Sequence, residues 1–161
     1  MKRLAQVIVT AFTVLLLALP AWATWTIAPS IVVEAGHYLK WKVVFTSDGS
    51  AMSATDILSS TYMGARMLRQ IQGETLMSMK VSPGTGGVIP DTTINIILSD
   101  DESDALYTET GISKDAISWH DLSDDINIYP PITGSLYVTF NDIGSNGDQV
   151  TLYFITWVEE E

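Results

Sequence analysis

Acidic and amide side chains gathered in turn-like segments are the first groups in this chain that could do chemistry. Three segments hold them: Asp100, Asp101, Glu102 and Asp104; Asp121, Asp124 and Asp125; and Asp142, Asn146 and Asp148. Ca²⁺ binds six to eight oxygen ligands of these kinds. The third segment is therefore our candidate calcium site, and Ca²⁺ is the one cofactor that the sequence suggests. Turns favour Asp and Asn without any metal, so plain solvated turns remain the alternative.

His120 is the candidate general base, because Asp121 follows it and a carboxylate can orient an imidazole. Neighbours in an extended strand point in opposite directions, however. No serine lies in a Gly-x-Ser-x-Gly nucleophile elbow. No two carboxylates are marked out by their spacing as a glycosidase pair, which must face each other across a cleft. The sequence therefore predicts a protein that is not an enzyme.

Trp119 is the residue that we expect to contact a partner. It lies in a polar stretch from Gly111 to Asp125, which is predicted to be a loop with one helical turn around Lys114 to Trp119. An exposed indole there could stack on a sugar ring. Trp41, by contrast, falls on the apolar side of an alternating segment and is predicted to lie in the core.

The composition excludes several classes of function. The chain has no cysteine, which removes thiol catalysis and cysteine-held metals. The glycine-rich segment 82–87 lacks the Gly-Lys-Ser/Thr ending of a phosphate-binding loop. The formal net charge of −11 becomes −13 without Lys2 and Arg3, because six basic residues then face nineteen acidic ones. Such a surface repels the phosphates of nucleic acids.

The first 23 residues have the order of a secretory signal peptide. Lys2 and Arg3 are followed by an apolar run over 4–19, a proline, and Ala21-Trp22-Ala23 as the cleavage site. Cleavage would leave residues 24–161 as a single exported domain, in the periplasm or outside the cell, with no membrane segment. The rival interpretation is an uncleaved membrane anchor, since a spanning helix needs about 20 apolar residues.

Alternating and β-branched segments predict the strands that must position these groups. Tyr38–Thr46, Gly134–Phe140 and Gln149–Val158 alternate between apolar and polar residues, and the last two are predicted to pair as a hairpin. Further strands are expected at 30–35, 75–81, 93–98 and 105–108. A short helix is predicted within Thr55–Gln72, ended by Gly73. Seven or eight short strands separated by turns predict an all-β fold, a single antiparallel β-sandwich of jelly-roll type.

Four short motifs follow one another in a characteristic order. They are the strand ending in Phe45-Thr46-Ser47-Asp48-Gly49, the segment from Ile71-x-Gly73-x-x-Leu76 to Pro83–Pro90, the strand Ile94–Leu98 followed by Asp100 and Asp104, and the segment from Gly134-Ser135-Leu136 to Leu152-Tyr153-Phe154. In this order the chain resembles small phage-type β-sandwich proteins, mostly described as hypothetical or virion-associated. The resemblance implies a sandwich fold and no catalytic residues. The segment 55–69 and the signal peptide depart from that group.

One expected function and one alternative follow. We expect a non-enzymatic structural or assembly protein, a virion- or surface-associated subunit whose partners are copies of itself or other structural subunits. Exposed strand edges on a small rigid body suit that use. The alternative is an exported binding module for a glycan or a cell-surface partner, with or without calcium. Neither nucleic acid nor, after signal cleavage, a membrane is an expected partner.

Overall fold

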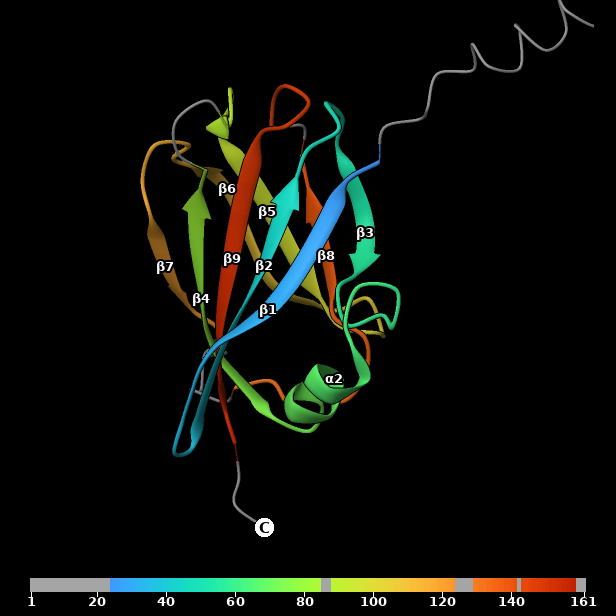
Figure 1. Ribbon diagram of the computed structural model, residues 1–161. Helices are drawn as coiled ribbons and strands as arrows, with labels where there is room; N and C mark the ends of the chain where they lie inside the picture. The colour runs from blue at the N-terminus through green and yellow to red at the C-terminus, as the bar shows by residue number, and fades with distance from the viewer. Residues whose placement is uncertain (1–23, 85–87, 124–128, 142, 159–161) are drawn as a thin grey trace, which may run out of the picture.

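The computed structural model describes residues 24–158 except 85–87, 124–128 and 142, and these residues form two antiparallel sheets and one short helix (Figure 1). The elements are β1 (Thr26–Ala35), β2 (Tyr38–Thr46), β3 (Met52–Asp56), α2 (Ala65–Ile71), β4 (Thr75–Pro83), β5 (Ile94–Ser99), β6 (Ala105–Ile112), β7 (Ser118–Asp121), β8 (Tyr137–Phe140) and β9 (Gln149–Trp157). The predicted signal segment, residues 1–23, lies outside the described residues. No helix within them is long and apolar enough to cross a membrane.

The strand order is that of a jelly roll with one added strand. The first sheet has the order β1-β2-β9-β4-β7, and the second has the order β3-β8-β5-β6. Apart from the step from β5 to β6, the chain from β2 to β9 changes sheet at each connection, which is the winding of an eight-stranded jelly roll. β1 adds a ninth strand beside β2. The predicted all-β sandwich is confirmed, with nine strands in the described part of the chain rather than seven or eight.

Alternation along the strands places one side of each sheet in the core. In β2 every second residue from Leu39 to Phe45 is buried, and in β9 the same holds from Val150 to Phe154. Trp41 is 0% exposed and stacks on Phe154 at 4.3 Å between ring centroids, so its predicted place in the core is confirmed. Phe45 meets Phe140 of the opposite sheet edge-on at 5.0 Å. Such aromatic pairs contribute beyond the area that they bury.

The helix is shorter than the predicted 55–72 segment, because that segment begins as strand β3. Thr55 and Asp56 pair with Val138 and Tyr137 of β8. Asp56 does not cap a helix: its Oδ1 accepts the N–H of Leu58 at 2.9 Å in a turn. The helix starts only after Gly64.

The end of the helix is as predicted. Gln72 is the C-cap, and Gly73 follows it with φ of 91°. This left-handed conformation is unfavourable for residues with a Cβ.

The predicted hairpin of the last two alternating segments is wrong. β8 pairs with β3 and β5 in one sheet, whereas β9 pairs with β2 and β4 in the other. Both strands present an apolar side to the same core, so their alternation is equally compatible with facing each other or lying side by side. Residues 141–148 therefore connect the sheets instead of closing a hairpin.

Candidate functional site

Strand β7 carries candidate residues on both of its faces. Its residues alternate between partly buried and exposed positions. His120 pairs in register with buried Met79 of β4, so Ser118 and His120 lie on the core side. Trp119 is 57% exposed and lies with Asp121 on the outer side. The predicted loop and helical turn in this region are therefore wrong, while the role of Trp119 as a partner contact stays a prediction.

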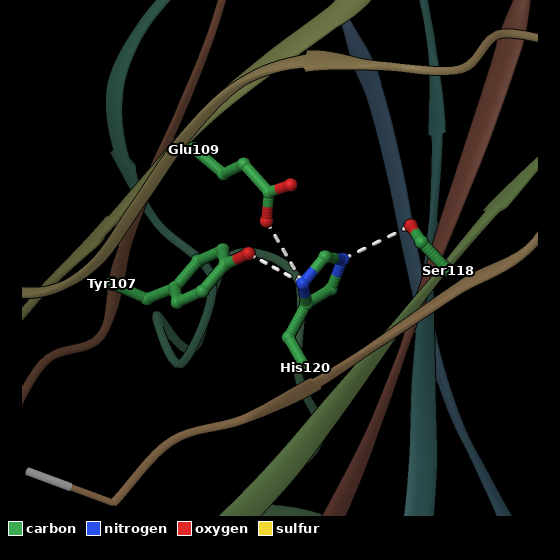
Figure 2. Close-up of polar contacts among 4 residues, drawn as sticks. All are labelled: Tyr107, Glu109, Ser118 and His120. Atoms are coloured by element: carbon green, nitrogen blue, oxygen red, sulfur yellow. Dashed lines mark hydrogen bonds and ion pairs between the residues drawn. The ribbon is translucent and has the colours of Figure 1, made fainter.

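Four polar side chains link the two sheets at this edge (Figure 2). Tyr107 and Glu109 come from β6, and Ser118 and His120 come from β7. His120 Nδ1 lies 2.5 Å from the Tyr107 hydroxyl oxygen and 2.9 Å from Glu109 Oε2. His120 Nε2 lies 3.0 Å from Ser118 Oγ. Because β6 and β7 end different sheets, this cluster closes one flank of the sandwich.

The His120 ring has hydrogen-bond partners in either protonation state. In the neutral ring with hydrogen on Nε2, the Tyr107 hydroxyl donates to Nδ1 and Nε2–H donates to Ser118 Oγ. In the charged ring, Nδ1–H donates to the Glu109 carboxylate. A histidine side chain that is only 10% exposed is thereby satisfied without an external ligand.

Ser118, His120 and Glu109 have the pairwise spacing of a serine nucleophile, a base and an orienting carboxylate. The carboxylate is Glu109, and Asp121 points to the other face of β7, as expected for neighbours in a strand. Sequence reasoning missed Glu109 because nothing in the sequence shows that β6 and β7 face each other. The same contacts also join the two sheets, and that role requires no substrate.

Asp121 places a fixed negative charge at the end of β7. The backbone N–H of Ser123 donates to Asp121 Oδ1 at 2.9 Å, and this hydrogen bond is the main reason that the pKa of the Asp121 carboxyl is lowered. The Ser123 side chain lowers it further, desolvation by burial opposes this, and the Tyr129 hydroxyl, 3.4 Å from Oδ2, has the least effect of the four and lowers it. The group therefore stays ionised below the usual range for aspartate.

Lysines and aromatic residues alternate across the outer face of the five-stranded sheet. Lys42, Tyr153, Lys80 and Trp119 lie in register on β2, β9, β4 and β7. Lys40 lies on the same side of β2 as Lys42. We call these five residues the lysine–aromatic face.

The lysine ammonium groups of this face approach its rings. Lys80 Nζ lies 4.6 Å from the Tyr153 ring centroid and 5.4 Å from that of Trp119. Lys40 Nζ lies 5.4 Å and 5.8 Å from the same two centroids, and Lys42 Nζ lies 6.0 Å from Tyr153. These distances suit cation–π attraction. Among the described residues, no carboxylate forms an ion pair with any of the three ammonium groups.

The predicted calcium ligands belong to the segment before β9. Asp142 lies outside the described residues. Asp148 is 6% exposed, and its Oδ2 accepts the backbone N–H of Ser145 at 2.8 Å, so one of its oxygens already closes the turn. Asn146 and Asp148 share an open hollow with Asp91. In the part of the chain that the structure describes, no three His, Asp or Glu side chains are placed to hold a metal, and the calcium site stays a prediction.

Comparisons with known proteins give a distant structural likeness. No protein-family model and no curated protein matches the sequence. The cupin domain of Schizosaccharomyces pombe Cnp3 is similar in structure, with a TM-score of 0.34 and 12% sequence identity over 88% of this chain and 68% of that chain. A likeness this distant carries no argument about ligands or activity.

Proposed function

We propose that the protein is a non-enzymatic structural subunit that assembles with further copies of itself, in a virion or in an exported surface layer. The observation that carries the proposal is the exposed apolar end of the β1–β2 hairpin. The resemblance to small virion-associated sandwich proteins supports the same role. The fold itself is compatible with many functions, so the proposal rests on this surface.

The hairpin end combines an open strand edge with apolar side chains. β1 is the last strand of its sheet in the described part of the chain, so one side of its backbone has no strand beside it. Four large apolar side chains here are exposed: Ile31 37%, Val32 41%, Val33 49% and Tyr38 47%. We call residues 31–38 the β1–β2 tip, and in Figure 1 it projects beyond the rest of the sandwich. Exposed apolar strand edges promote pairing between chains.

A second copy of the chain is the occupant that fits this edge. Two β1 strands can pair antiparallel about a twofold axis, so that each copy offers the same surface to the other. Pro29 interrupts the earlier part of β1, and the bulge between Ile31 and Val33 interrupts the tip itself, so Val33–Ala35 is the uninterrupted end of the strand. These features restrict pairing to the end of the strand. Glu34 at this end accepts a hydrogen bond from Gln70 of α2 at 3.3 Å, which brings the tip into contact with the helix.

Light scattering after gel filtration tests the proposal directly. The wild-type protein should elute with the mass of a dimer or a larger assembly at high concentration and shift toward the monomer on dilution. A monomeric mass at every concentration, from a folded sample, would remove the basis of the proposal.

A second candidate function is an exported binding module, and the lysine–aromatic face favours it. This face lies on the outer side of the five-stranded sheet, whereas the β1–β2 tip extends past the end of the sandwich. One protein can therefore use both surfaces. Calcium dependence of such binding stays a separate prediction, tested by adding Ca²⁺ and then a chelator.

A further inference from the structure

We propose that the lysine–aromatic face binds an acidic glycan, a saccharide that carries carboxylate or sulfate groups. The inference goes beyond self-assembly and does not depend on it. It rests on the composition of the face, on its charge relative to the rest of the chain, and on the exposure of Trp119.

The charge of the face is opposite to that of the molecule. Residues 24–161 hold six basic and nineteen acidic residues, and three of the six basic residues lie on this one face. Their ammonium groups form no ion pair with a carboxylate among the described residues. An unneutralised positive patch on an acidic protein attracts anions locally while the surrounding surface repels them. The occupant that complements this face is therefore an anionic group.

The aromatic residues restrict the class of ligand to anionic molecules that also have flat apolar surfaces. The row from Lys42 to Trp119 crosses three strand spacings, which is roughly 14 Å. Along it, ammonium groups and ring faces alternate, and Trp119 is 57% exposed at one end. A pyranose ring presents C–H groups to an aromatic face, and its acidic substituents reach the neighbouring lysines. An oligosaccharide of acidic sugars matches this alternation along the row.

Asp121 lies at one border of the face, and replacing it should change ligand binding in the direction opposite to replacing a lysine. Asp121 belongs to the row of residues next to the row that contains Trp119. The row of Asp121 crosses the sheet through Lys40, Ile155, Ser78 and Asp121, which lie side by side on four strands. The Asp121 carboxylate repels an anionic ligand at the border of the face. Asp121→Asn should therefore strengthen the binding that lysine substitutions weaken.

Binding to immobilised polygalacturonate and to dextran sulfate, with neutral dextran as reference, tests the inference. The wild-type protein should bind one or both acidic polymers and not neutral dextran. Lys80→Gln should weaken this binding about threefold, as removal of one exposed charge contact does, and Trp119→Ala about tenfold. Lys114→Gln, which removes a lysine outside the face, is the matched control and should leave binding unchanged.

Several outcomes would overturn the inference. They are equal binding of neutral dextran, no binding of either acidic polymer by folded protein, equal effects of Lys80→Gln and Lys114→Gln, and equally tight binding of single-stranded poly(dT). A change in oligomeric mass on Lys80→Gln without polymer binding would instead assign the face to a second copy. Measured at a concentration at which the wild type is also monomeric, so that avidity does not enter, Val33→Lys should not affect polymer binding; failure of the assembly proposal and failure of this inference are therefore distinguishable.

Discussion

Replacing Val33 by lysine should weaken self-association by at least about thirtyfold. Burying a whole valine side chain is worth about 1.5–3 kcal/mol. Only 49% of Val33 is exposed. Covering this exposed half of the side chain is therefore worth about 1 kcal/mol per copy. A twofold interface contains Val33 twice, so its loss removes about 2 kcal/mol, or about thirtyfold in Kd. The added charge opposes pairing further, because lysine is a residue that blocks strand edges.

Sedimentation velocity over a dilution series measures this change. The wild type should sediment as an assembly at concentrations where Val33→Lys is monomeric. Ile97→Lys is the matched control, because Ile97 is also exposed, at 41%, but lies on β5 of the other sheet. Thermal melts should show all three proteins folded, since exposed substitutions usually change stability by within about 0.5 kcal/mol. Equal sedimentation of Val33→Lys and wild type, or an equal shift with Ile97→Lys, would refute the argument.

Three further predictions concern export, packing and the His120 cluster. Intact mass spectrometry of protein from its native source should give a chain that begins at Thr24; a mass that includes residues 1–23 would mean that the segment is retained as an anchor. Gly84→Ala should lower the free energy of unfolding by about 1–3 kcal/mol, because a Cβ there would lie 2.4 Å from the carbonyl oxygen of Val88; an unchanged denaturation midpoint would contradict this packing. His120→Ala should destabilise the fold by about 1–3 kcal/mol, since its partners lose a hydrogen bond, while hydrolysis of a small ester stays at the buffer rate in both proteins; turnover that is lost in the variant would make the cluster catalytic.

The strands were predictable where apolar and polar residues alternate, because the alternation shows which side chains are buried. Tyr38–Thr46 has the bounds expected from its alternation, and Gln149–Trp157 differs from expectation by one residue. In each, a side chain is apolar because it faces the core, so the pattern is visible without knowing any partner strand. The same locality explains why Gly73 marked the helix end correctly.

The pairing of strands was not predictable, because it depends on partners far away in the sequence. Alternation in β8 and β9 shows that each has an apolar side, and both a hairpin and a crossing between sheets bury that side. The sequence predicts a loop at β7, since its four residues contain a single large apolar side chain, Trp119. The structure shows that this side chain is exposed. The strand conformation of β7 comes from pairing with β4.

Both candidate sites depend on contacts between strands and not on the sequence of any one strand. The lysine–aromatic face gathers residues from four strands, and the His120 cluster joins β6 to β7. Sequence reasoning selected Trp119 and His120 as single residues. Their neighbours Lys80 and Glu109 carried no local signal that could have found them.

Density-gradient sedimentation of the protein from its native source tests the central claim most directly. If the protein is a structural subunit, it should sediment with particles much larger than a single chain, and the Val33→Lys variant should be absent from those fractions. Recovery of the folded wild type only as a slow monomer, without any particle, would contradict assembly and leave the exported binding module as the function to pursue.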